Sequence, residues 1–322
     1  MAEAVLEVKD LHTYFFTDAG VVKAVSGVNF KLERGQSLGV VGESGSGKSI
    51  TALSIMRLIQ PPGKTVSGQI LLEGKDLLKL SKREMAKIRG NEIAMIFQDP
   101  MTSLNPVLRV GEQIMEAIML HQDVTKQQAQ QMAIDMLTKV GISEAETRIK
   151  RFPHEFSGGM RQRVMIAIGL SCNPKVLIAD EPTTALDVTI QAQILDLINC
   201  LQRDLNTATL LITHDLGVVA ETCQSVLVMY AGRPVEYSDV TTILEKPKHP
   251  YTWGLLASLP KINETEQQRL SPIAGSPPDL GNLPAGCPFA PRCPHKKPIC
   301  ETEDSVGQML ASGHYVSCHL YD

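Results

Sequence analysis

The sequence lacks several features that would place the chain in a specialised class of protein. No apolar run approaches the roughly 18 residues that a membrane-spanning helix requires. The first ten residues are acidic and strand-like, without the layout of a secretory signal peptide. We therefore expect a cytoplasmic chain that reaches a membrane only through partner proteins.

The chain also lacks an excess of positive charge. Its 31 Lys and Arg stand against 35 Asp and Glu, which gives a formal net charge of −4. A dedicated nucleic-acid binder normally carries a basic surface, so the composition argues against nucleic acid as a partner. There is no internal repeat, and residues 98–157 show no sustained heptads, which argues against a long coiled coil.

The most specific motif is Gly-Glu-Ser-Gly-Ser-Gly-Lys-Ser at residues 42–49. It fits the P-loop pattern G-x-x-x-x-G-K-[ST], whose backbone N–H groups cradle the phosphates of a nucleoside triphosphate. The context agrees, because residues 37–41 predict a buried strand and residues 50–59 a helix whose N-terminus attracts anions. We expect the lysine to reach the β- and γ-phosphates and the last serine to bind Mg²⁺. The expected nucleotide-binding residues of the loop are Gly42, Ser44, Gly45, Ser46, Gly47, Lys48, Ser49 and Ile50.

A second element of a nucleotide site is an apolar strand, residues 176–179, that ends in Asp180 and Glu181. In P-loop enzymes an Asp at such a strand end helps to hold Mg²⁺. A carboxylate one residue later can orient and polarise the attacking water. Asp180 is therefore the expected magnesium ligand, and Glu181 is the expected catalytic residue.

A third element, Ser157-Gly158-Gly159, opens a predicted helix. Free N–H groups and a hydroxyl at a helix start form a second anion site. Because one chain holds two such helix starts, a head-to-tail pair of chains could sandwich each nucleotide between them.

The pattern of elements predicts an α/β protein. From residue 37 to residue 213 strands alternate with helices, which indicates a parallel sheet covered on both faces, and the first 35 residues indicate antiparallel strands beside it. After about residue 245 prolines become frequent, which predicts an irregular module without regular helix or central strand. We expect a P-loop ATPase domain over residues 1–245, with a helical subdomain at about 99–170, and a C-terminal module over residues 246–322.

The order of these motifs resembles that of the ATP-binding cassette (ABC) family of ATPases. Residues 156–160, Phe-Ser-Gly-Gly-Met, resemble the ABC signature with Phe and Met in place of the usual Leu and Gln, and Arg161 continues it. The match to the D-loop is Thr184-Ala185-Leu186-Asp187. The resemblance implies that Ser157, Gly158, Gly159, Arg161 and Asp187 contribute to nucleotide binding.

Three further positions match the family. Gln98 matches the Q-loop glutamine, which the resemblance places near Mg²⁺ or the attacking water. His214 matches the switch histidine, which is expected to hydrogen-bond the γ-phosphate. Phe15 matches the aromatic residue that stacks on adenine, with Tyr14 and Phe16 as alternatives in a shifted register.

The resemblance narrows to the ATPases of oligopeptide and dipeptide importers. Residues 95–106, 179–193 and 249–252 match this branch, as does the Gly-Cys-Pro-Phe…Arg-Cys-Pro tail. It implies a D-type, ATP-hydrolysing subunit at the cytoplasmic face of the inner membrane. Its partners would be a second homologous ATPase, two transmembrane permease subunits and, indirectly, a peptide-binding protein. A nickel or other small-solute importer of this branch, or a soluble ABC ATPase outside transport, are the alternatives.

Four cysteines crowd into the C-terminal segment: Cys287, Cys293, Cys300 and Cys318. A cytoplasmic location disfavours disulfides, and the C-x2–4-C pairs of structural zinc sites are missing. Four thiolates can hold a [4Fe–4S] cluster, whose ligand spacing is more variable, and the family resemblance supports this interpretation. A zinc site and the absence of any metal stay open as alternatives.

Overall fold

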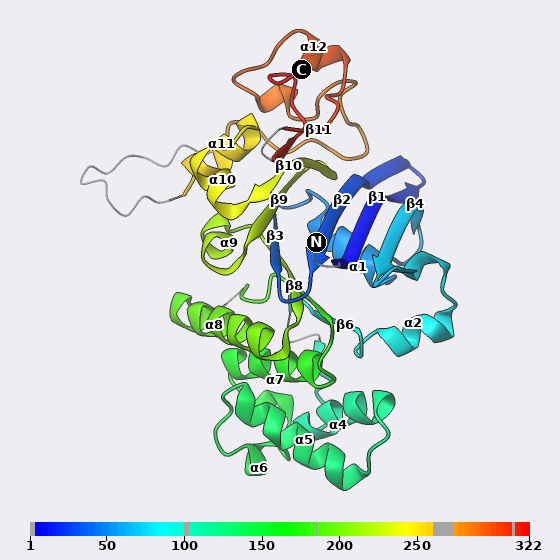
Figure 1. Cartoon of the computed structure of the whole chain (residues 1–322), viewed down its shortest axis with the longest axis vertical. Coiled ribbons are helices and arrows are strands. Elements are labelled where there is room, and N and C mark those ends of the chain that lie inside the picture. The colour runs from blue at the N-terminus through cyan, green and yellow to red at the C-terminus, as the bar shows by residue number, and fades with distance from the viewer. Residues whose placement is uncertain (1–3, 100–102, 185, 260–272, 311–312) are drawn as a thin grey trace, which may run out of the picture. The chain divides into compact units, whose positions relative to one another are not determined.

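The computed structural model describes residues 4–99, 103–184, 186–259, 273–310 and 313–322 (Figure 1). The chain forms two compact units, neither of which is continuous in sequence. The first unit comprises residues 1–5, 32–36 and 79–210, and the second comprises residues 6–31, 37–78 and 211–322. The predicted domain boundary at residue 245 lies inside the second unit and does not coincide with the division between the two units. It stays a prediction.

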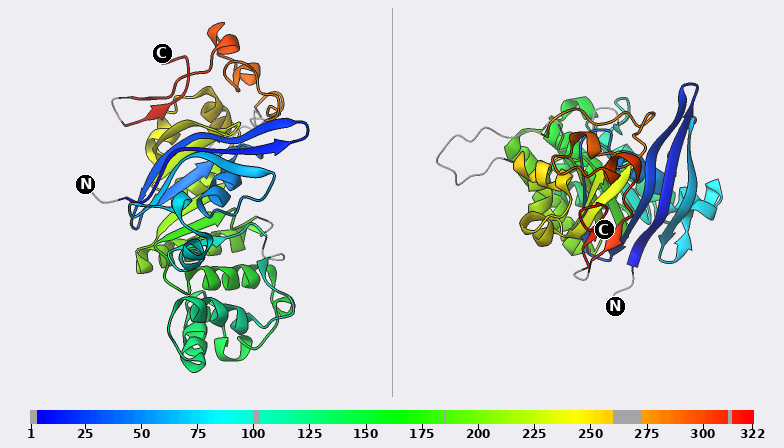
Figure 2. Two further views of the ribbon diagram at one scale, coloured as in Figure 1. Left: turned by 90° about the vertical axis from the view of Figure 1, so that its right-hand side faces the viewer. Right: turned by 90° about the horizontal axis from the view of Figure 1, so that it is seen from above.

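The second unit contains an antiparallel sheet with the strand order β2-β1-β4-β5. Figure 2 shows its first two strands side by side as a long twisted ribbon. The first 35 residues, for which the sequence predicts strands, form two long ones. The members of the sheet are β1 (Ala4–Thr17), β2 (Gly20–Glu33), β4 (Gly63–Leu72) and β5 (Lys75–Asp76).

A second sheet of the same unit carries the P-loop strand. The strands of this sheet that lie wholly within the unit have the order β11-β12-β10-β9-β3, and β3 runs parallel to β9 with Val41 opposite Val228. All five residues of β3 are buried, as expected for a parallel strand covered on both faces. The other ladders, β9 with β10, β10 with β12 and β12 with β11, are antiparallel, so the sheet is mixed. The strands are β3 (Ser37–Val41), β9 (Ser225–Tyr230), β10 (Arg233–Asp239), β11 (Gln308–Met309) and β12 (Tyr315–Val316).

The helices of the second unit are short. They are α1 (Lys48–Ile55), α9 (Leu216–Thr222), α10 (Val240–Glu245), α11 (Pro250–Ala257) and α12 (Ile299–Thr302). A further strand, β8 (Ala208–Thr213), begins in the first unit and ends in the second.

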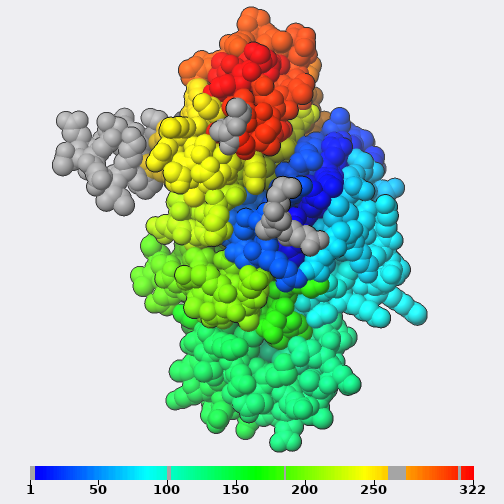
Figure 3. Space-filling view, in the orientation of Figure 1, coloured from blue at the N-terminus to red at the C-terminus, as the bar shows by residue number. Residues whose placement is uncertain are grey.

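The proline-rich tail is more regular than its sequence predicts. The expectation that it contains no regular helix is wrong, because α11 is a helix of eight residues. Its proline, Pro250, is the first residue of the helix. An N–H at that position would make no hydrogen bond within the helix, so its absence in proline costs nothing there. The tail also adds β12 beside β10, at the end of the mixed sheet (in Figure 3 the part of the tail from residue 273 onward is orange to red).

A buried carboxylate fixes both ends of this tail to the sheet. The Glu236 side chain, on β10, is fully buried and accepts hydrogen bonds from the backbone N–H groups of Lys248 and His249. It also lies 2.7 Å from Nε2 of His314, just before β12. One side chain thus holds the start of the tail and its last strand.

The first unit is mainly helical around a parallel pair of strands. β6 (Ile93–Ile96) pairs with β7 (Val176–Asp180). Residues 110–139 form two helices, because Gln122 is extended and Thr125 begins the second helix with a capping box. The helices are α2 (Lys82–Ile88), α4 (Val110–His121), α5 (Lys126–Lys139), α6 (Ala145–Arg148), α7 (Gly158–Leu170) and α8 (Val188–Leu205).

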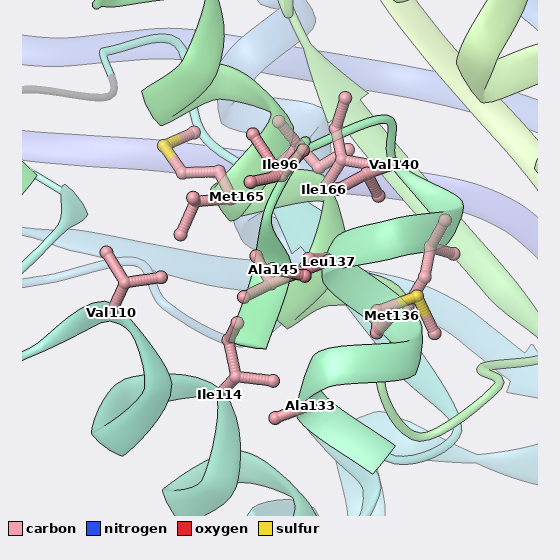
Figure 4. Close-up of a cluster of buried hydrophobic side chains, with 14 of the residues drawn as sticks. Ile96, Val110, Ile114, Ala133, Met136, Leu137, Val140, Ala145, Met165 and Ile166 are labelled. Atoms are coloured by element: carbon pink, nitrogen blue, oxygen red, sulfur yellow. The ribbon is translucent and has the colours of Figure 1, made fainter. Parts of the chain in front are cut away.

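The core of the first unit joins these helices to β6. Figure 4 shows the side chains of Ile96, Ile114, Leu137 and Ile166 directed into one cluster. Each is at most 1% exposed, and burying such a side chain stabilises the fold by about 1.5–3 kcal/mol. In the described parts of the chain, no helix combines the length and the apolar character needed to cross a membrane.

Candidate functional site

The P-loop of the second unit wraps around the ammonium group of Lys48. Its Nζ donates hydrogen bonds to the carbonyl oxygens of Gly42 (2.7 Å) and Glu43 (2.9 Å), and the side chain is 5% exposed. The first position must be glycine, because a Cβ at Gly42 would lie 2.2 Å from the carbonyl oxygen of Met229. The loop therefore fixes the lysine among backbone groups of the same loop.

The loop leads directly into α1. The residue before the helix, Gly47, has a φ of 97°, in the left-handed region that favours glycine, and a Cβ there would lie 2.4 Å from the carbonyl oxygen of Ala24. Because the N-cap residue is a glycine, no side chain caps the first N–H groups of the helix, and these groups are suited to bind an anion. The helix begins at Lys48 and ends at Ile55, earlier at both ends than the predicted 50–59.

In the first unit, the end of β7 brings together two residues that the sequence analysis assigned to catalysis. Nε2 of Gln98 donates a 3.0 Å hydrogen bond to Oε2 of Glu181, and the hydroxyl of Thr184 donates a 2.8 Å hydrogen bond to the same oxygen. These bonds orient the carboxylate. Asp180, the last residue of β7, is 6% exposed.

The backbone at Glu181 is strained. Its φ of 46° lies in the left-handed region that residues other than glycine rarely adopt. Such conformations cost of order 1–3 kcal/mol and cluster at functional sites. The strain places the carboxylate beyond the strand end, where Gln98 and Thr184 hold it.

Two other predicted site residues lie in the second unit. His214 directly follows β8 and is exposed. Phe15 lies on β1 opposite Gly63. A Cβ added to this glycine would lie 2.6 Å from Cε1 of the Phe15 ring, so the ring packs directly against the glycine. Successive strand residues point to opposite faces, so Phe15 faces away from Tyr14 and Phe16. The adenine-stacking role stays a prediction for all three.

The signature-like segment is the start of α7. Ser157 is the N-cap residue, with Oγ 3.4 Å from the N–H of Met160, and both Ser157 and Gly158 are exposed. Gly159 lets α8 come close, because a Cβ there would lie 2.8 Å from Cγ2 of Ile190. Nε of Arg161 donates to the carbonyl oxygen of Pro153 and fixes the preceding turn.

Asp187 of the D-loop segment begins the next helix. Its Oδ1 accepts a 2.9 Å hydrogen bond from the N–H of Ile190, so it is the N-cap of α8. This gives the residue a structural role beside the predicted nucleotide contact. Ala185 of the D-loop segment and residues 100–102 of the segment after Gln98 lie outside the described residues.

The four C-terminal cysteines line one small cavity of the second unit. His249, His295 and His319 line the same cavity. Burial raises the pKa of Cys287 and Cys293, and raises that of Cys318 to about 11. Among the described residues, no group of three or more His, Cys, Asp or Glu side chains has the arrangement of a metal-ion site. The iron–sulfur assignment is thus not confirmed and stays a prediction.

Two tail residues that the sequence analysis did not assign contact the P-loop. The hydroxyl of Tyr251 accepts a 2.8 Å hydrogen bond from the N–H of Glu43. The guanidinium of Arg292 forms two hydrogen bonds with the Glu43 carboxylate. No sequence motif marks either contact, since the partners are more than 200 residues apart.

Comparison with known families gives two matches along the chain. Residues 25–184 match the ABC transporter family. Residues 235–300 match the C-terminal region of oligopeptide/dipeptide transporters, which covers three of the four tail cysteines.

Several characterised proteins are similar over nearly the whole chain. The oligopeptide transport ATP-binding protein AppD of Bacillus subtilis is 54% identical over 98% of this chain and 97% of its own length. OppD of Escherichia coli, also an oligopeptide transport ATP-binding protein, is 54% identical over 94% of this chain and 89% of its own. The dipeptide transport ATP-binding protein DppD of Bacillus subtilis is 50% identical over 99% of this chain and 96% of its own length.

Solved structures of the same kind share the fold. The bacterial ABC transporter cassette MJ0796, solved as a dimer, matches 73% of this chain and 98% of its own with a TM-score of 0.65 and 25% identity. The structure of cbiO1 from Clostridium perfringens, part of the ABC transporter complex cbiONQ, matches 76% of this chain and 92% of its own. Its TM-score is 0.64 and its sequence identity is 26%. The predicted P-loop cassette fold with an antiparallel β subdomain is therefore confirmed.

Proposed function

This chain belongs to the ATP-binding proteins of ABC transporters, in the oligopeptide/dipeptide branch, and on this premise we propose that it hydrolyses ATP to power peptide import. The observation that carries the proposal is the P-loop, with Lys48 held at its centre by the carbonyl oxygens of Gly42 and Glu43. The chain is a peripheral subunit that works beneath membrane permease subunits.

Residues from several sequence motifs act together on the nucleotide. Lys48 and the first N–H groups of α1 bind the phosphates, while Ser49 and Asp180 hold Mg²⁺. When bound, ATP and Mg²⁺ supply the γ-phosphoryl group for transfer to water and neutralise its charge. Glu181 orients the attacking water, and Gln98 keeps that carboxylate in place through its 3.0 Å hydrogen bond.

The remaining predicted residues complete the proposed site. His214 hydrogen-bonds the γ-phosphate, and Phe15 stacks on adenine. The start of α7, with Ser157 and its two glycines, binds the nucleotide held by the P-loop of a partner ATPase. A homologous second subunit that forms a heterodimer supplies the reciprocal surface.

The experiment that tests this function uses the complex purified from detergent-solubilised membranes. Mass identification should find a second cassette and two permease subunits with this chain. Vesicles that contain the complex should hydrolyse ATP faster when a peptide-loaded binding protein is added. Stimulation by a nickel-loaded binding protein instead would support the small-solute alternative, and recovery of the chain without membrane subunits would contradict a role in transport.

For the tail we propose that Cys287, Cys293, Cys300 and Cys318 bind one [4Fe–4S] cluster. The support is that all four side chains line one cavity of the second unit. A four-iron cluster is wider than a single ion, so its thiolates surround a cavity rather than converge on one point. When bound, the cluster supplies four Fe–S bonds to a segment with a small apolar core, and we infer a structural role for it.

The cluster proposal predicts the metal content of the protein. Anaerobically purified chain should be brown and hold about four iron and four sulfide. Cys300→Ser should lower the iron content and make residues beyond about 275 sensitive to protease, because thiolate ligation contributes folding energy. The matched control is Cys200→Ser, an exposed cysteine of α8 in the first unit, which should keep its iron. Zinc in place of iron would indicate a tetrahedral site, and absence of both metals would remove the shared role.

A further inference from the structure

A buried arginine of the C-terminal segment pairs with the P-loop. Nη1 of Arg292 lies 2.6 Å from Oε2 of Glu43, and Nη2 lies 3.0 Å from Oε1, which is a two-bond pairing of guanidinium and carboxylate. The Arg292 side chain is only 4% exposed, and that of Glu43 is 27% exposed. A pair with this geometry and burial is stronger than an ordinary surface ion pair.

The arginine is also fixed by contacts with the tail and with β9. Its Nε donates a 2.9 Å hydrogen bond to the carbonyl oxygen of Ala274, and Nη1 lies 3.3 Å from the hydroxyl of Tyr230. The same hydrogen bonds to Glu43 raise the pKa of Arg292 above its usual value, so the guanidinium stays charged. The tail thus presents one permanent positive charge at a defined position.

Glu43 is held at three separate points. Its N–H donates to the hydroxyl of Tyr251, its carbonyl oxygen accepts from Nζ of Lys48 and from the N–H of Ser46, and its carboxylate accepts from Arg292. Two of these four partners come from the tail. Residues more than 200 positions away in sequence therefore help to fix the residue whose carbonyl oxygen contacts the P-loop lysine.

The charge of Glu43 is unfavourable for a loop that binds a triphosphate. A carboxylate near the bound phosphates repels them, and the repulsion is large where water does not screen it. Arg292 removes most of that repulsion because it neutralises the carboxylate by direct contact.

We propose that Arg292 and Tyr251 are positioning residues for nucleotide binding, through which the C-terminal segment holds the P-loop and neutralises Glu43. The proposal deepens the proposed ATPase function and rests on it. Arg292 immediately precedes Cys293, so the conformation of the cysteine segment determines where Arg292 lies relative to the P-loop. A change that unfolds this segment weakens ATP binding without touching a nucleotide contact.

The test measures ATP hydrolysis by the assembled complex and fluorescent-ATP binding by the full chain. Arg292→Ala should raise KM and Kd for ATP about tenfold, the order expected for one partly screened like charge near the triphosphate, while kcat changes less. Adding Glu43→Gln to Arg292→Ala should restore most of the affinity, because it removes the unpaired carboxylate. Tyr251→Phe should weaken binding by about threefold through the lost acceptor.

The controls separate this inference from the function on which it rests. Lys296→Ala removes an exposed ion pair with Glu301 in the same tail and should leave the ATP affinity unchanged. Lys48→Ala should abolish binding; if it does not, the nucleotide site itself is misassigned. If Lys48→Ala abolishes binding while Arg292→Ala binds normally, only the positioning role is wrong. Equal losses in Arg292→Ala and the double variant, with matching drops in melting temperature, would indicate a purely structural contact and overturn the proposal.

Discussion

Glu181→Gln is expected to reduce ATP turnover by the assembled transporter at least about 100-fold while ATP binding persists. The amide keeps the size of the side chain but cannot accept a proton from, or strongly polarise, the attacking water. Gln98 and Thr184 both donate hydrogen bonds to the Glu181 carboxylate, so a neutral amide at this position is also held less firmly. The measurement is phosphate release under saturating ATP, together with the amount of nucleotide retained by the complex.

A second consequence of Glu181→Gln is a stable closed pair of cassettes. We expect two cassettes to close around ATP and to separate after hydrolysis, so a variant that binds but cannot hydrolyse should retain ATP and elute as the dimer. The matched control is Glu92→Gln, because Glu92 is a half-exposed carboxylate of the same unit that pairs with Lys175 before β6 and β7 begin. Turnover of Glu181→Gln at the rate of this control would show that Glu181 is not the catalytic residue.

Ser157→Arg is expected to have the second largest effect and to act in trans. A bulky cation at the start of α7 blocks the anion site formed by this helix start. In a head-to-tail pair that site serves the nucleotide of the partner, so turnover should fall about 100-fold at the partner's P-loop. Binding at the Lys48 P-loop of the substituted chain should remain near normal, which fluorescent-ATP titration of the isolated chain measures.

The matched control for Ser157→Arg is Thr125→Arg. Thr125 is an exposed N-cap residue of α5 in the same unit, with no predicted nucleotide contact. Both variants lose a helix cap, which costs about 1 kcal/mol of stability, so any difference in turnover reports on the nucleotide. Loss of ATP binding by the Ser157→Arg chain alone would contradict the head-to-tail arrangement.

The sequence predicts the parts of the site that depend on short segments. The P-loop is an example, because eight consecutive residues contain the glycines that the backbone needs and the lysine that it surrounds. Gln98 and Glu181 are each predicted as catalytic residues, but the 3.0 Å hydrogen bond between their side chains is seen only in the structure. These elements carry their own signal in residue type and spacing.

The parts that the sequence does not predict depend on contacts between distant segments. Arg292 has no local pattern that indicates Glu43 as its partner, because the pair is separated by 249 positions. The helix α11 was not predicted because prolines are frequent around it. A proline at the first helical position is nevertheless compatible with a helix. The number of prolines in a segment is therefore a poor predictor of helix, because the effect of each proline on a helix depends on its position.

The two shortest strands of the mixed sheet follow all its other strands in the sequence and are synthesised after them. Until Val316 has been synthesised, β10 presents an unpaired edge, because its partner β12 does not yet exist. An exposed edge of this kind can pair with another chain and lead to aggregation. Once complete, β11 and β12 end the sheet with strands of only two residues each, which offer little length for such pairing. A premature stop shortly before residue 315 would therefore yield a chain that retains every nucleotide motif and yet tends to precipitate in the cell.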